Sequence, residues 1–581
     1  MKKICVVLLT VMMIVGAASA ERLYMPGTYE GTAPGYHGTI HVSVEVDEDT
    51  ILAVTVGENE ETYHVGEKVF PILSESIVSN QSLADVVTGA TISSRAMTNA
   101  VVKALENANA SSETISALKA VPLKIENPGD TETDVVVVGA GVAGMMAASH
   151  AVDNGARVIL LEKNSLVGGS ALISAGAMLS VGDEAITDTT FTAEDVYRWY
   201  NIQSGPVLND DVFYEIMNNT KFAVEYLKKN GTEFGDPGMN QAKLAPIFRS
   251  IGGLHFGTSL IDGMESILAD RAVDLRTNTF AVGLIYDDDG KIAGVTAQNG
   301  AGTYAISAKK VILATGGFAF NSELMEQYAA EYTGDFIITT SGATGDGHKM
   351  GMEAGGHLIG DGVLQIYCTS YDPSLDGNQP GFIPLMVDST GNQMCALDEY
   401  YGTVTTKIMN LPDRKAYAIY SSDNIYVQFD YPNGGFKLVD MDALVESGKL
   451  VKADTLEELA EKIGIDPASL IRSVEEHNWY YDLQINDAWG TDASALQPMK
   501  LGPYYAAREV ACVMGTIAGL EINTDMQVID EEGDAIENLY AVGELIFGNV
   551  FNKRYPMSGT AIGIASTSGM LAGIHAAESL K

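Results

Sequence analysis

The chain has 581 residues, of which 46% are hydrophobic and 19% charged, a composition typical of a globular protein and not of a disordered one. This length is enough for about three or four domains with large cores. The formal net charge of -41 argues against nucleic acid and anionic membrane surfaces as partners, because phosphate binding needs clustered Lys and Arg.

The first twenty residues have the pattern of a secretory signal peptide. Lys2 and Lys3 precede an apolar run over residues 4–15, and an Ala-Ser-Ala triplet ends at Ala20. The run is too short for a membrane anchor, and no later apolar stretch approaches the roughly 20 residues that a spanning helix needs. We therefore expect residues 1–20 to be removed and the protein to act outside the cytoplasmic membrane, without a transmembrane segment.

Three cysteines remain after such a cleavage: Cys368, Cys395 and Cys512, with no Cys-x-x-Cys pattern. Their spacing argues against haem attachment, iron-sulfur clusters and structural zinc. We expect three free buried thiols and no metal site. Any electron carrier in this protein is then expected to be an organic cofactor.

Residues 21–110 are expected to form a small α+β domain. Period-2 alternation over residues 39–46 predicts a strand, and a second strand follows at residues 51–56. Helical patterns follow near residues 68–80 and over residues 93–107.

Between these two helical patterns lies the stretch Asp85-Val-Val-Thr-Gly-Ala-Thr91. Gly89 and Ala90 leave the backbone bare before the last Thr, and the following helix offers free N–H groups to an anion. An isolated Gly-Ala-Thr would be an ordinary turn with a Thr helix cap. The whole stretch resembles the FMN-binding domain of sodium-pumping NADH:quinone oxidoreductases and of exported reductases. That resemblance implies FMN esterified to Thr91 by an FMN transferase.

Residues 111–131 contain Ser, Pro and Gly residues that are typical of loops, and we expect them to form a linker. A βαβ pattern follows the linker. A buried strand leads into Gly139-Ala-Gly-Val-Ala-Gly144 and a helix, and the next strand ends at Glu162. In a dinucleotide fingerprint, Gly139 and Gly141 admit a pyrophosphate, Gly144 allows close helix packing, and the acid binds ribose hydroxyls. A structural βαβ turn without a nucleotide is the alternative.

Later segments resemble the fumarate reductase flavoprotein family, at residues 168–178, 311–318, 342–347, 539–544 and 558–562. The resemblance implies an α/β architecture. A Rossmann-like FAD domain in two parts, residues 132–366 and 515–581, would carry an inserted α+β capping domain at residues 367–514. The small FMN-binding domain and the signal peptide would precede it.

The same resemblance implies a set of contacts to non-covalent FAD. They are Gly139, Gly141, Ala143, Gly144, Glu162, Lys163, Gly169, Ser170, Gly176, Ala314, Thr315, Gly316, Asp346, Glu544, Ser558, Ala561 and Ile562. The last two would present N–H groups of a helix N-terminus, which favours the negative charge of reduced flavin. Only one fingerprint is present, so NADH is not expected as a direct donor. Covalent FMN is then the expected electron entry, reduced by a membrane-bound quinol or flavin system.

Most substrate-binding residues of the fumarate and urocanate reductases in this family are absent. Their Gly-Lys-Arg-Phe stretch corresponds to residues 391–397, without Arg, and their catalytic Arg falls near Ile425. Their two His positions fall at Tyr367 and Gly515, and their Asn-Arg-Leu-Gly-Gly becomes Tyr-Pro-Met-Ser-Gly at residues 555–559. Because the missing guanidinium groups would form charge-assisted bonds to a dicarboxylate, fumarate is not the expected substrate.

The Tyr-Pro-x-x-Gly spacing of Tyr555 and Gly559 resembles 3-ketosteroid dehydrogenases. The resemblance implies that the Tyr hydroxyl and the Gly N–H bind a substrate carbonyl, where they would stabilise an enolate. Tyr367 and Tyr401 offer phenols that can deliver a proton. The alternative for each is a core or surface tyrosine. Arg554 could instead pair with an acidic substrate, and His348 is expected near FAD or on the surface and not in catalysis.

We therefore expect an exported flavoprotein reductase of the kind used in anaerobic respiration. Electrons would pass from covalent FMN through FAD to the C=C bond of a small unsaturated substrate, an enone or enoate. Two alternatives remain: a flavin dehydrogenase or desaturase of the ketosteroid type, and a flavin electron carrier without substrate turnover.

Overall fold

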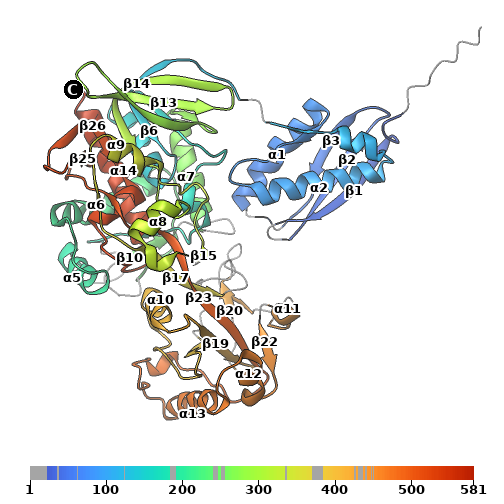
Figure 1. The fold of residues 1–581 in the computed structure, drawn as a ribbon, viewed down its shortest axis with the longest axis vertical. Helices are drawn as coiled ribbons and strands as arrows, with labels where there is room; N and C mark the ends of the chain where they lie inside the picture. The colour runs from blue at the N-terminus through green and yellow to red at the C-terminus, as the bar shows by residue number, and fades with distance from the viewer. Residues whose placement is uncertain are drawn as a thin grey trace, which may run out of the picture. The chain divides into compact units, whose positions relative to one another are not determined.

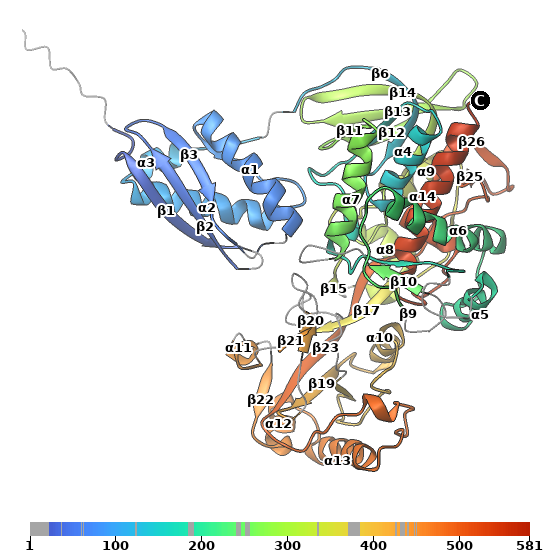
Figure 2. The ribbon, with the colours of Figure 1, turned by 180° about the vertical axis from the view of Figure 1, so that it is seen from behind.

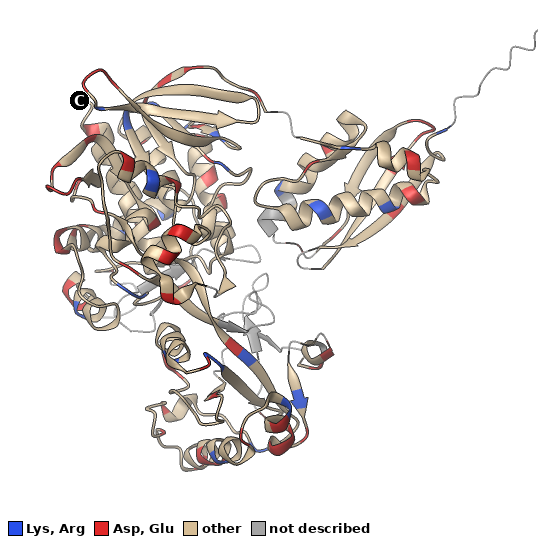
Figure 3. Cartoon of the chain, viewed as in Figure 1, with Lys and Arg blue, Asp and Glu red and all other residues tan. Residues whose placement is uncertain are grey.

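A computed structural model describes residues 22–35, 38–59, 61, 63–122, 125–183, 191–239, 246–249, 256–333, 336–369, 384–423, 427–429, 436–438, 441–446, 448 and 450–581. The expected signal peptide and Ile425 lie outside the described residues. The chain divides into two compact units, Met1–Glu61 with Val65–Leu123 and Thr62–His64 with Lys124–Lys581. Asp and Glu residues occur along both units (Figure 3). Within the described part, no helix has the length and apolar character needed to cross a bilayer.

The first unit contains a three-stranded antiparallel sheet and two long helices (Figures 1 and 2). These are β1 (Gly27–Pro34), β2 (Thr39–Val46), β3 (Ile51–Val56), α1 (Tyr63–Asn80) and α2 (Thr91–Asn107). Alternate residues of β2, from Ile40 to Val46, are buried, as the period-2 pattern predicts. Helix α2 lies so close to β1 that a Cβ on Gly31 would meet the Ala100 carbonyl oxygen at 2.0 Å.

Part of the expected linker, residues 111–131, has regular structure. Helix α3 (Ser112–Ala117) is capped by the Ser111 side chain, and β5 (Ala120–Val121) pairs in parallel with β4 (Leu83–Ala84). The first unit extends to Leu123 because this backbone pairing ties the segment to the residues just before the Thr91 motif.

The second unit is built on an eight-stranded sheet with the order β11-β7-β6-β14-β13-β12, and with β26 pairing to both β14 and β25. Its strands are β6 (Thr131–Val138), β7 (Val158–Leu161), β11 (Asp274–Arg276), β12 (Phe280–Tyr286), β13 (Ile292–Asn299), β14 (Gly302–Leu313), β25 (Gln527–Ile529) and β26 (Ala535–Ala541). Strands β7, β6, β14 and β26 run parallel. Their carboxyl ends therefore meet at one edge of the sheet, where doubly wound folds bind nucleotides.

Helices and two small sheets flank this central sheet. They are α4 (Val142–Asp153), α5 (Ala193–Gln203), α6 (Asp210–Lys229), α7 (Phe256–Asp270), α8 (Ser322–Tyr328), α9 (Asp346–Glu353), α14 (Thr560–Glu578), β8 (Ala177–Leu179), β9 (Gly238–Met239), β10 (Pro246–Arg249), β16 (Leu358–Ile359) and β24 (Gly519–Leu520).

A second lobe of this unit contains a six-stranded sheet and four helices (Figure 1). These are β15 (Phe336–Ile337), β17 (Val363–Thr369), β18 (Leu385–Asp388), β19 (Ala416–Ser421), β22 (Val451–Ala453), β23 (Tyr504–Thr516), α10 (Tyr401–Asn410), α11 (Met441–Glu446), α12 (Leu456–Ile463) and α13 (Pro467–Leu483). A small hairpin, β20 (Val427–Phe429) and β21 (Phe436–Leu438), lies in the same segment.

The expectation of three free thiols is wrong for Cys512, which is disulfide-bonded on β23. Cysteine spacing does not reveal this bond, because pairing depends on which side chains the folded chain brings together. Cys395 is a free buried thiol, as expected, and burial raises its pKa to about 12.

Helices α4 and α14 pack backbone to backbone. A Cβ on Gly569 would meet the Ala143 carbonyl oxygen at 2.2 Å, and one on Gly573 would meet the Ala147 carbonyl oxygen at 2.3 Å. Only glycine at these two positions allows the helices to lie this close.

Replacement of Gly569 by alanine is therefore expected to destabilise the protein, although alanine favours a helix more than glycine does. We expect the free energy of unfolding to fall by about 1–2 kcal/mol, because the added methyl group forces the helices apart. Chemical denaturation measures the change. Gly283→Ala, at a position in β12 where a Cβ meets nothing within 4 Å, is the matched control. A stabilised Gly569→Ala variant would contradict this account of the packing.

Candidate active site

A cavity of about 520 Å³ lies in the second unit, where the parallel strands end and the N-termini of α4 and α14 meet. Every residue expected to contact FAD lines this cavity except Gly144. That glycine has a packing role, because a Cβ there would meet the Gly139 carbonyl oxygen at 1.8 Å.

The glycine turn leaves room for a ligand at the N-terminus of α4. Gly139 has a φ of +105°, and Gly141 is the N-cap of the helix with no side-chain hydrogen bond. A Cβ on Gly141 would meet nothing within 4 Å. The N–H groups of the first helical turn therefore face open space, which is the arrangement that binds a pyrophosphate.

Glu162 is buried at the end of β7 and is held by the backbone. Its carboxylate accepts hydrogen bonds from the Ala140 N–H at 3.0 Å and the Asn164 N–H at 2.8 Å. Burial raises the pKa of this carboxyl, and the two N–H bonds oppose the rise. The carboxylate thus lies fixed at the cavity wall, where a ribose hydroxyl could donate to it.

Lys163 is the only cation among the described residues that line the cavity. Its Nζ lies 2.7 Å from Asp346 Oδ2 and 2.6 Å from Thr344 Oγ1. This charge is already paired within the protein.

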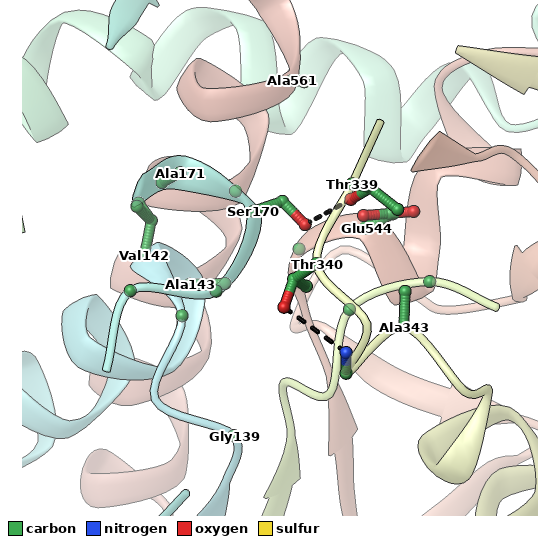
Figure 4. A pocket seen from close by; sticks show the side chains of 18 of the residues that line it. Gly139, Val142, Ala143, Ser170, Ala171, Thr339, Thr340, Ala343, Glu544 and Ala561 are labelled. Atoms are coloured by element: carbon green, nitrogen blue, oxygen red, sulfur yellow. Dashed lines mark hydrogen bonds between the residues drawn. The ribbon is translucent and has the colours of Figure 1, made fainter. Parts of the chain in front are cut away.

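The two walls of the cavity approach each other near its middle (Figure 4). Ser170 Oγ lies 2.7 Å from Thr339 Oγ1, and Thr340 Oγ1 accepts a bond from the Gly342 N–H at 3.4 Å. Thr339 and Thr340 were not anticipated from the sequence, since they lie outside the segments that resemble known flavin-binding motifs.

Glu544 is a buried acid at the same cavity. Its Oε1 accepts hydrogen bonds from the Thr516 N–H at 2.7 Å and from Thr516 Oγ1 at 3.1 Å. Burial raises the pKa of this carboxyl to about 7, although the bonds from Thr516 oppose the rise. A Cβ on Gly317 would meet Glu544 Oε1 at 1.8 Å, so this glycine makes room for the acid.

Aromatic and hydroxyl side chains form the other end of the cavity. Tyr555 Oη accepts a hydrogen bond from the Ala561 N–H at 3.3 Å, at the N-terminus of α14. Ser558 Oγ donates to Tyr401 Oη at 3.0 Å. Gly559 is the N-cap of α14 with a φ of +86°. Three of the four residues expected in catalysis, Tyr401, Tyr555 and Gly559, therefore line one end of the cavity.

Tyr367 is not among the residues that line the cavity. It is buried on β17, where Leu364 and Ile366 do line the cavity. Because side chains alternate along a strand, Tyr367 lies on the opposite face from Ile366.

His348 and Arg554 also lie away from the cavity lining. His348 is fully buried, so it is not a surface residue, and its Nε2 lies 3.1 Å from the Ala518 carbonyl oxygen. Burial lowers the pKa of its imidazole to about 4. Arg554 is exposed.

The Thr91 motif lies in the first unit at the start of α2. Its cap, Ala90, provides no side-chain hydrogen bond, and the Ser94 N–H donates to the Ala90 carbonyl. Thr91 is partly buried, and Gly89 before it is exposed with a φ of +95°. The first turn of α2 therefore presents backbone N–H groups beside the Thr91 side chain, where an anion is favoured.

Two family models match the chain. A model described as FAD binding domain matches residues 134–562, and one described as FMN-binding domain matches residues 35–106. A urocanate reductase of Eggerthella lenta is 34% identical over 550 residues, covering 89% of this chain and 87% of that protein. A probable fumarate reductase of Shewanella frigidimarina is 30% identical and covers 78% of this chain and 76% of that protein. The open conformation of a flavocytochrome c3 fumarate reductase is similar in structure, with a TM-score of 0.62, 27% identity, and coverage of 78% of this chain and 79% of that chain.

Glu544 gives a testable pH dependence of stability. A carboxyl whose pKa is raised in the folded state is most favourable to folding below its ordinary pKa of 4.5, and this contribution is lost as the pH rises to about 7. Across this range, the unfolding free energy of the parent should fall by about 3 kcal/mol relative to Glu544→Gln. Denaturation of the FAD-free protein at a series of pH values measures this difference. Glu537→Gln, which removes a carboxylate from an exposed ion pair with Lys291, is the control for the loss of one negative charge. Parallel curves for the parent and Glu544→Gln would refute the assignment.

Proposed function

The chain belongs to the FAD binding domain family and is an FAD-dependent oxidoreductase of the fumarate reductase type, which acts on CH–CH groups and uses FAD and FMN. From this premise we propose that it reduces the C=C bond of an alkene that a carbonyl group activates, and that fumarate is not its substrate. One observation carries the proposal. At the end of the cavity, the uncharged hydroxyl groups of Tyr401 and Tyr555 lie beside Gly559, at the N-terminus of α14.

Reduction of such an alkene adds a hydride to the β-carbon and a proton to the α-carbon, and bound FAD supplies the hydride. Tyr555 Oη and the Gly559 N–H bind the carbonyl oxygen, where negative charge develops, and the N-terminus of α14 favours that charge. Tyr401 Oη donates the proton to the α-carbon. The bond from Ser558 Oγ to Tyr401 Oη, 3.0 Å long, stabilises the phenolate that remains.

The charges at the cavity support an acceptor other than fumarate. Lys163, the one cation among the described lining residues, is paired with Asp346, and Arg554 is exposed and does not line the cavity. Among the described lining residues, a dicarboxylate would find no unpaired guanidinium or ammonium group for its two charges. Burial of unpaired charges is strongly unfavourable, whereas a ketone or ester oxygen needs only hydrogen-bond donors.

Electrons enter, in this proposal, through FMN esterified to Thr91 by an FMN transferase. The positive end of α2 and the exposed Gly89 close to Thr91 support the attachment. The signal pattern of residues 1–20 supports export, and a membrane-bound quinol or flavin system then supplies the electrons. The protein serves as a terminal reductase of anaerobic respiration outside the cytoplasmic membrane.

Anaerobic turnover with reduced viologen as donor tests the reaction. We expect enones or enoate esters to reoxidise the viologen faster than fumarate or urocanate does. Turnover of fumarate alone would contradict the proposal. Failure of every alkene would favour an electron carrier, and reduction of a dye by a saturated ketone would favour a desaturase of the ketosteroid type.

The Thr91→Ala variant tests the route of electrons separately. We expect it to lose FMN, seen as a missing FMN mass on the intact protein, and to keep FAD. Turnover with reduced viologen should stay within about twofold of the parent if viologen reduces FAD directly. Thr88→Ala is the matched control, because Thr88 is exposed in the same motif and is not the proposed ester site. FMN on the Thr91→Ala protein would refute the attachment site.

A further inference from the structure

Two tyrosine rings lie next to each other at the substrate end of the cavity. The centroids of the Tyr401 and Tyr555 rings are 6.4 Å apart, with 33° between the ring planes, and both residues line the cavity. Tyr400 and Tyr401, in comparison, have centroids only 4.4 Å apart. Because both residues line the cavity, part of each tyrosine side chain borders the space that a ligand would occupy.

Each of the two rings is held by a neighbouring aromatic ring and by a hydrogen bond to its hydroxyl group. Tyr401 packs against Tyr400, and Ser558 Oγ donates to its hydroxyl. Tyr555 meets Phe551 edge to face, with centroids 5.8 Å apart and planes at 86°, while the Ala561 N–H donates to its hydroxyl. Rings fixed in this way lose little conformational entropy when a ligand binds.

The walls beside these rings are apolar. Leu364 and Ile366 from β17, Met514 from β23, and Phe547 line the same cavity. The described polar groups that hydrogen-bond here are the neutral hydroxyls of Tyr401, Tyr555 and Ser558 and the backbone N–H of Ala561. A flat apolar ligand with a hydrogen-bond acceptor at one edge matches this distribution.

We propose that this end of the cavity selects an uncharged alkene that is conjugated to an aromatic ring, with Tyr401 and Tyr555 as the side chains that stack on the ring. The substrate class is an aryl enone or an aryl acrylate ester. The proposal rests on the proposed alkene reductase function and adds the specificity of the site. Tyr401 thereby has a binding role through its ring that is separate from the proton-donor role of its hydroxyl.

Matched ligand pairs test the preference. Benzylideneacetone and ethylideneacetone are both neutral enones, but the first has a phenyl group where the second has a methyl group. Methyl cinnamate and cinnamate share the phenyl group, but only cinnamate is charged. With reduced viologen as donor, we expect kcat/KM to be at least about tenfold higher for the aryl enone and for the ester than for their partners.

Binding of the saturated ketone benzylacetone to the oxidised holoenzyme, measured by calorimetry, tests the rings without turnover. Tyr401→Leu should weaken benzylacetone binding about tenfold and leave methyl propyl ketone within about twofold. Tyr401→Phe keeps the ring and should bind benzylacetone as the parent does, while its kcat falls. Trp479→Leu is the control, since it removes an aromatic ring that is 55% exposed on α13 and does not line the cavity.

The possible failures are distinguishable. If no alkene is reduced but benzylacetone binds through Tyr401, the alkene reductase function fails and the aromatic site stands. If both enones are reduced at equal rates, or if Tyr401→Leu binds benzylacetone as tightly as the parent, the aromatic site is refuted and the reductase function stands.

Discussion

The close packing of α4 against α14 is the constraint on which the active site depends. Gly569 and Gly573 on α14 lie against the carbonyl oxygens of Ala143 and Ala147 on α4. This contact brings the N-termini of both helices to one cavity. One N-terminus has the open space that a pyrophosphate needs, and the other ends beside the Tyr401 and Tyr555 hydroxyls. Small residues far from the chemistry therefore determine the separation of the two ends of the site.

In the proposed reaction, helix dipoles and hydroxyl groups take the place of charged side chains at the substrate end of the cavity. The protein is strongly acidic, with a net charge of -41, and the one cation that the described cavity lining contains is paired with Asp346. Positive potential then comes from the N-termini of α4 and α14. A helix N-terminus carries only about half of an elementary charge, which suits an oxygen that becomes negative during reaction more than a carboxylate that is negative from the start.

Features with a local physical signature could be predicted from the sequence. Alternation placed the strand over residues 39–46, and the Gly139–Gly144 turn, followed by the acid Glu162, indicated the nucleotide-binding βαβ unit. Features that depend on distant contacts could not be predicted. Tyr367 looked like a site residue, but strand alternation places it on the opposite face from Ile366, which lines the cavity. Thr339 lies in no recognisable sequence motif. The disulfide bond of Cys512 depends on which side chains meet in the folded chain.

FMN on Thr91 and FAD are proposed to supply electrons to the same alkene, and the stoichiometry of the product gives the most direct test. The flavinylated protein is reduced fully, freed of reductant, and mixed without oxygen with excess benzylideneacetone. We expect two molecules of saturated ketone for each parent chain, because each flavin stores two electrons, and one molecule for each Thr91→Ala chain. Equal yields from the two proteins would show that the Thr91 flavin does not supply electrons to the alkene.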